Sequence, residues 1–155
     1  MMTDCKVKQR TIGKEVSLTG VGLHTGKEVT ITFKPAPENN GYTFVRVDLE
    51  GNPVIEADAN YVVNTQRGTN LEKRGVKIQT SEHVLAALVG MEVDTCIIEL
   101  NASEPPIMDG SSKFFVEAIE EAEFEGVGAL EVVFEFAEGE DEIDVGVAGL
   151  GWLLG

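Results

Sequence analysis

The strongest constraint on the fold is the strict alternation of apolar and polar side chains over residues 28–34. Val29, Ile31 and Phe33 alternate with two threonines and a lysine. A period of two predicts a strand with one buried and one solvated face. Such a strand needs neighbours, and the chain offers several more β-type segments. They are residues 9–21, 42–49, 54–55, 61–63, 76–78 and 94–100.

Two segments instead carry the spacing of helices. Residues 82–89 follow a possible N-cap, Thr80 or Ser81, and precede Gly90, a typical residue just beyond a helix end. Their core-facing stripe is Val84, Leu85 and Leu88. A second helix is expected to open at Ser111, and its apolar face is Phe114, Phe115, Ala118, Ile119 and Ala122. The order of strands, helix, strand and helix predicts an α+β fold, a β-sheet with two helices packed on one face.

The distribution of charge divides the chain. It has 155 residues, 43% of them apolar, and a net charge of −15. All lysines and arginines lie at or before Lys113, whereas residues 114–155 contain twelve acidic groups and no basic one. We therefore expect a domain over 1–122 and an acidic, Gly/Leu-rich tail over 123–155. Nucleic acid is a poor partner for such a chain.

Composition excludes other classes. No run of about 18 apolar residues is present, so no membrane span is expected. The N-terminus lacks the apolar stretch of a signal peptide. Two cysteines, Cys5 and Cys96, cannot build a disulfide framework, and we expect both to be reduced thiols in the cytosol.

The pair Glu82–His83 is the first candidate for chemistry. A helix N-terminus favours an ionised carboxylate and a neutral imidazole. A general base needs the former and a metal ion needs the latter. The pair also fits a plain structural role, an ordinary acid in the first helical turn beside a half-buried histidine. The zinc-protease pattern H-E-x-x-H is absent, because Ala87 stands four residues after His83.

Other candidates are less specific. His24 lies among three glycines, which indicates a tight turn, yet neither a G-x-G-x-x-G nor a Walker A spacing is met. Asp109 lies in a rigid loop before the second helix and is expected to be structural. A catalytic zinc typically has three protein ligands. His24, Asp109 and Cys96 are the remaining possible ligands, and no spacing singles one out.

Several segments, in this order and at these intervals, resemble a known family. They are Gln9-Arg10-Thr11, Thr19-Gly20-Val21-Gly22-Leu23-His24-Thr25-Gly26, Pro35-Ala36-Pro37, Thr80-Ser81-Glu82-His83 and Pro106-Ile107-Met108-Asp109-Gly110-Ser111. Over residues 8–122 the chain resembles the first domain of the UDP-3-O-acyl-N-acetylglucosamine deacetylases, the zinc amidases of lipid A synthesis. The resemblance implies a cytoplasmic enzyme of a Gram-negative-type bacterium, about twice this length. It also implies two similar domains with the active site between them.

The resemblance also implies residue roles. Glu82 would be the general base that acts with a zinc-bound water, and His83 would be the zinc (Zn²⁺) ligand from the first domain. His24 would have a supporting role. An insert over about 54–79 would lie near the substrate entrance, where Thr65, Gln66, Arg67 and Gly68 could line the site. The substrate would be UDP-3-O-acyl-N-acetylglucosamine.

The chain departs from that family pattern in its last part. The resemblance implies two more zinc ligands and a catalytic histidine in a second domain, but this chain has no histidine after His83. We expect a truncated first domain that is inactive alone, with its helical face left for the missing domain or for self-association. The tail over 123–155 raises the hypothesis of an out-of-frame or foreign sequence. Two alternatives stay open: a non-catalytic half-domain that binds a nucleotide sugar or a partner, and one half of a split enzyme.

Overall fold

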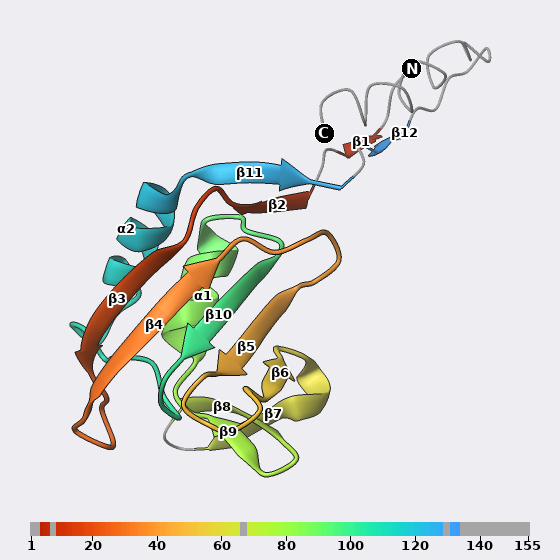
Figure 1. The fold of residues 1–155 in the computed structure, drawn as a ribbon. Coiled ribbons are helices and arrows are strands. Elements are labelled where there is room, and N and C mark those ends of the chain that lie inside the picture. The colour runs from red at the N-terminus through yellow and green to blue at the C-terminus, as the bar shows by residue number, and fades with distance from the viewer. Residues whose placement is uncertain (1–3, 7–8, 66–67, 129–130, 134–155) are drawn as a thin grey trace, which may run out of the picture.

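The main sheet has five strands in the order β3-β4-β10-β5-β6 (Figure 1). The computed structural model describes residues 4–6, 9–65, 68–128 and 131–133. The strands of this sheet are β3 (Val16–Val21), β4 (Glu28–Lys34), β10 (Cys96–Leu100), β5 (Tyr42–Arg46) and β6 (Val54–Glu56). All neighbours are antiparallel except β10 and β5, which are parallel. Parallel strands need a long crossover, and here the crossover carries a small sheet and the first helix.

The alternation in β4 has the predicted consequence. Val29, Ile31 and Phe33 are fully buried, while the polar residues between them face the open side of the sheet. On that side Thr32 and Thr30 form hydroxyl hydrogen bonds of 2.8 and 3.0 Å with Ser17 and Thr19 of β3. The sheet is therefore apolar on its inner face and polar on its outer face, as expected of an antiparallel sheet with one covered side.

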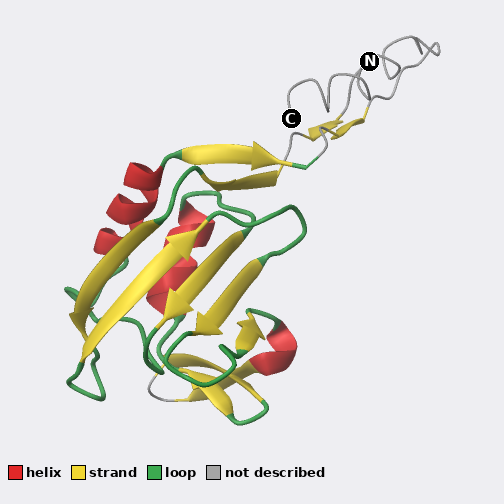
Figure 2. Ribbon diagram, in the orientation of Figure 1, coloured by secondary structure: helices red, strands yellow, loops and turns green. Residues whose placement is uncertain are grey.

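Both helices cover the same face of the sheet (Figure 2). They are α1 (Glu82–Gly90) and α2 (Lys113–Ala122). Phe115 of α2 meets Phe33 of β4 edge to face, with ring centroids 6.3 Å apart. The core between helices and sheet is continuous with the buried residues of β4, β5 and β10. The predicted α+β fold, a sheet carrying two helices on one face, is confirmed.

The helix ends differ in detail from the sequence expectation. Ser81 is the N-cap of α1, but its hydroxyl makes no capping bond. Gly90 lies inside α1, and the left-handed residue beyond the helix is Glu92, with φ 59°. The second helix begins at Lys113, two residues after the expected Ser111. At α1 the Ser81 hydroxyl donates instead to the distant carbonyl of Thr69.

Three smaller sheets flank the main one. The first joins β7 (Val62–Thr65), β8 (Gly68–Lys73) and β9 (Val76–Ile78), after the short 3-10 helix η1 (Ala59–Tyr61). The second pairs β2 (Gln9–Ile12) with β11 (Phe124–Val127), and the third pairs β1 (Asp4–Lys6) with β12 (Glu131–Val133).

These pairings change two expectations. Residues 64–70 lie between the expected β-type segments 61–63 and 76–78, yet most of them belong to the β7–β8 ladder. Residues 124–127 were not expected to be a strand, yet they pair with β2. Of the acidic tail expected over 123–155, residues 123–128 and 131–133 are described, and the rest lies outside the described residues. In the described part of the chain, neither helix has the length and apolarity needed to cross a membrane.

Candidate active site

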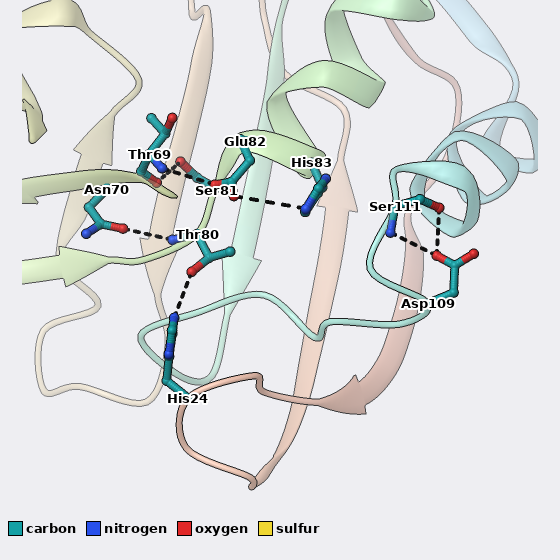
Figure 3. A network of polar contacts seen from close by, with 9 residues as sticks. All are labelled: His24, Thr69, Asn70, Thr80, Ser81, Glu82, His83, Asp109 and Ser111. Atoms are coloured by element: carbon teal, nitrogen blue, oxygen red, sulfur yellow. Dashed lines mark hydrogen bonds and ion pairs between the residues drawn. The ribbon is translucent and has the colours of Figure 1, made fainter. Parts of the chain in front are cut away.

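Glu82 and His83 occupy the first turn of α1, next to the small sheet. The two side chains are 36% and 35% exposed, and Glu82 Oε2 lies 4.0 Å from His83 Nε2 (Figure 3). The other carboxylate oxygen of Glu82 accepts a hydrogen bond of 3.1 Å from the backbone N–H of Thr69 in β8. One oxygen of Glu82 is thus fixed, and the other stays on the side of the imidazole.

The start of α1 is tied to β8 by three further bonds. The backbone N–H and the hydroxyl of Ser81 both donate to the carbonyl of Thr69, at 2.9 and 3.0 Å. The N–H of Thr80 donates to the Asn70 side-chain oxygen at 2.9 Å. Thr80 is buried and has φ 54°, a conformation that a β-branched residue rarely adopts. The chain accepts this strain where the candidate base is set in place, a common feature of functional sites.

The glycine-rich loop brings His24 to the same place. His24 Nε2 lies 3.3 Å from the Thr80 hydroxyl oxygen. The loop itself is closed by backbone bonds from Gly22 N to Lys27 O and from Gly26 N to Gly22 O, each 2.9 Å. The structure therefore brings His24 into contact with Thr80, two residues before Glu82.

Sequence reasoning missed the residue that holds this loop, Glu104. Its side chain is fully buried. It accepts the N–H of His24 at 3.1 Å on both oxygens and the N–H of Thr25 at 2.9 Å. Glutamate is almost never fully buried unless it is paired. The only local signal was an acidic residue directly before Pro105-Pro106, which by itself indicates a surface loop.

The remaining predicted site residues lie elsewhere or are not described. Asp109 accepts the N–H and the hydroxyl of Ser111 at 3.0 and 2.7 Å, so its bonds stay inside the turn before α2. Those bonds lower the pKa of Asp109 below its ordinary value. Thr65 and Gly68 are ladder partners at the end of the β7–β8 hairpin. Gln66 and Arg67 lie outside the described residues.

The described residues do not fit a complete zinc centre. Among them, no group of three or more His, Cys, Asp or Glu side chains is placed to hold a metal ion. A catalytic zinc typically needs three protein ligands, and here only His83 stands beside a carboxylate. Cys96, the third candidate ligand, is a buried free thiol on β10 whose pKa burial raises to about 12, so it is not a ready thiolate.

Several known proteins are similar to this chain. The family model of UDP-3-O-acyl N-acetylglycosamine deacetylase (LpxC) matches residues 9–142. A bifunctional LpxC/FabZ enzyme of Chlorobaculum tepidum is 48% identical over 145 residues, which is 90% of this chain and 31% of that protein. A UDP-3-O-acyl-N-acetylglucosamine deacetylase of Chromohalobacter salexigens is 45% identical over 79% of this chain and 41% of that protein.

The matches also bear on the extent of the chain. It spans about a third of the length of the relatives it matches, from 31% to 41% in these two cases. The family match reaches residue 142, well past the boundary expected at 122. The boundary at 122 and the hypothesis of a foreign tail both stay predictions. On the match of residues 9–142, this chain belongs to the LpxC family of UDP-3-O-acyl N-acetylglycosamine deacetylases.

Proposed function

We propose that this chain is the first half of a deacetylase active site that acts on UDP-3-O-acyl-N-acetylglucosamine. The observation that carries the proposal is the pair at the start of α1. Glu82 is fixed through one oxygen by the Thr69 N–H, and its other oxygen lies 4.0 Å from the imidazole of His83. Both side chains stay about one-third exposed, so a substrate and a second protein surface can reach them.

In the reaction we propose, Glu82 acts as the general base. It takes a proton from a water molecule that attacks the acetamide carbonyl carbon. The carbon–nitrogen bond then breaks, acetate forms, and the glucosamine nitrogen takes up the proton that the water lost and leaves as an amine. General bases of this kind contribute about 10²- to 10⁴-fold to a rate. The fixed oxygen orients the carboxylate and leaves the free oxygen to receive the proton.

His83 is proposed as the one metal-binding side chain that this chain contributes. Because no other ligand group gathers around it in the described part of the chain, the remaining ligands must come from outside those residues. We therefore propose that the chain alone is inactive. The related deacetylases are longer than the stretch that aligns with this chain. The rest of such a protein would supply the missing ligands and complete the site.

The proposal is tested by complementation. The purified chain is assayed alone and after mixing with the remaining part of the Chromohalobacter salexigens deacetylase, produced separately. We expect no turnover and less than one zinc per chain for this chain alone, and turnover on mixing. Glu82→Gln should lower that turnover at least about 100-fold, and His83→Ala should remove both turnover and retained zinc.

A matched control distinguishes the loss of the catalytic base from the loss of one negative charge. Glu50, exposed in the turn between β5 and β6, loses the same charge in Glu50→Gln and should leave the turnover of the mixture unchanged. Turnover in the mixture that survives Glu82→Gln would exclude Glu82 as the base. Turnover by the chain alone that depends on Glu82 and His83 would show that this chain completes its own site.

A further inference from the structure

The glycine-rich loop that carries His24 has the form of an anion-binding cradle. The group that occupies this cradle is a carboxylate of the same chain. The backbone N–H groups of His24 and Thr25 converge on the carboxylate of Glu104 at 2.9–3.1 Å. Converging backbone N–H groups of this kind commonly bind phosphates or other anions. Here the buried Glu104 fills the cradle, which explains a three-glycine motif without phosphate-loop spacing.

The loop is shaped closely around that carboxylate. A Cβ atom added at Gly22 would lie 2.7 Å from Glu104 Oε2 and 2.7 Å from Thr25 Oγ1, closer than real Cβ contacts come. Gly22 also pairs with Pro106, and the N–H of Ile107 donates to the Val21 carbonyl at 2.8 Å. The glycine is therefore needed because the Glu104 segment lies directly against the loop.

The same segment reaches the approach to α1. The N–H of Gln79 donates to the carbonyl of Ser103, the residue before Glu104. On the other side of the loop, His24 Nε2 lies 3.3 Å from the hydroxyl oxygen of Thr80, two residues before Glu82. A continuous path of contacts thus runs from Glu104 through His24 to Thr80 (Figure 3 shows its last step).

We propose that Glu104 is a positioning residue of the active site: its buried carboxylate holds the His24 loop so that the imidazole supports Thr80 in its left-handed conformation. Thr80 leads directly into Ser81 and Glu82, so the loop fixes the direction in which the candidate base enters α1. This role rests on the proposed function of Glu82. Burying a charged carboxylate is costly unless charge-assisted hydrogen bonds offset the loss of water, and the three backbone bonds here do so.

The test is nuclear magnetic resonance of the full 155-residue chain labelled with nitrogen-15, which requires no turnover. In Glu104→Gln, hydrogen exchange of the His24 and Thr25 amides should become at least about ten-fold faster. The His24 imidazole nitrogen signals and the Thr80 amide signal should shift. Amides of β4 and β10, such as Ile31 and Ile98, should keep their exchange rates within about two-fold.

Thr80→Val tests the other end of the path. Valine is also β-branched, so the left-handed strain is similar, but the hydroxyl is lost. The His24 imidazole signals should shift, while the His24 and Thr25 amides stay protected because Glu104 still holds them. Gly22→Ala keeps Glu104 in the sequence but places a Cβ atom against its carboxylate, and it should reproduce the effect of Glu104→Gln. Glu117→Gln, an equal charge change at an exposed position of α2, is the matched control and should change none of these signals.

Three results would each overturn the proposal. Unchanged His24 and Thr25 amides in Glu104→Gln would show that the loop holds itself by its own backbone bonds. Equal acceleration in β4 and β10 would show that Glu104 only stabilises the whole domain. If the His24 imidazole signals do not shift in Thr80→Val, the His24 loop does not act on Thr80 or on the start of α1. A failure of the complementation experiment, by contrast, would affect the role of Glu82 and leave these spectroscopic results standing.

Discussion

At the scale of single residues, the molecule places several polar groups where water does not reach them. Glu104 and Ser81 are fully buried, and Arg46 is 7% exposed. Each is compensated: Glu104 by backbone N–H groups, Ser81 by the Thr69 carbonyl, and Arg46 by Asp48 at 2.7–2.8 Å and the Lys77 carbonyl at 2.9 Å. The Arg46 guanidinium lowers the pKa of Asp48 below its ordinary value. The large majority of buried polar groups in proteins have such partners.

Cys96 gives a pH prediction at this scale. Burial raises the pKa of its thiol from 9.0 to about 12. Between these two values the unfolded chain has lost the thiol proton and the folded chain keeps it, so the free energy of unfolding falls as pH rises. The loss is about 1.4 kcal/mol per pH unit for one proton, and below pH 9 this contribution is constant.

Cys96→Ala removes that dependence. Near pH 8 the variant should be less stable by about 1 kcal/mol, because a buried sulfur is lost. At about pH 9.7 the two free energies of unfolding should be equal, and above that pH the variant should be the more stable, since only the wild type loses stability through this thiol. Urea unfolding with a reducing agent present measures the free energy of unfolding of both proteins at each pH. Parallel pH profiles for the two proteins would contradict a buried, protonated thiol.

At the scale of elements, α2 packs on the sheet through apolar side chains. Phe115 is 1% exposed and packs edge to face on Phe33. Ala118, Ile119 and Ala122 continue the buried stripe along the helix. A helix of ten residues is marginal by itself, so α2 owes its stability to this face and not to its own propensity.

Phe115→Ala should therefore destabilise the domain by about 4 kcal/mol, the usual effect of removing a buried phenylalanine. That is a large fraction of the 5–15 kcal/mol expected for a domain of this kind. Its neighbour Phe114 is only half-buried, and Phe114→Ala should lower the free energy of unfolding by less than half as much. The measurement is urea unfolding followed by circular dichroism. Equal losses in the two variants would show that α2 does not pack as described.

At the scale of the whole molecule, α1 keeps part of its apolar surface exposed. The helices cover the inner face of the sheet, and α1 still exposes Ala86, Val89 and Gly90 on its far side. Val89 is 63% exposed, the largest fraction among the exposed large apolar side chains that are described. Exposed apolar patches can mark protein–protein interaction surfaces, so this face is where the self-association expected from the sequence can be tested.

We expect the chain to self-associate through this helical face when no partner covers it. Sedimentation velocity should show a concentration-dependent shift from monomer to dimer. Val89→Glu should move the distribution toward monomer, because a charge on this face opposes its burial. Val54→Glu, on the outer face of the sheet where Val54 is 44% exposed, is the matched control and should leave the association unchanged. An equal effect of both variants would place the contact elsewhere.

What the sequence alone determined follows from short-range periodicity. The period of two in β4, the helical stripes of α1 and α2, and the order of elements were sufficient for the α+β fold. The motif order was sufficient for the family. These features could be predicted because side chains two, three or four residues apart share a face whatever the rest of the chain does.

The tertiary structure alone decided the features that join distant residues. His24 and Glu104 lie 80 residues apart and His24 and Thr80 lie 56 apart, and β2 pairs with β11 across the length of the domain. No local pattern marks such contacts, since a buried glutamate and a surface one look alike in sequence. These contacts form because packing excludes water from the polar groups involved. Each buried donor then needs an acceptor elsewhere in the protein, and each buried acceptor needs a donor.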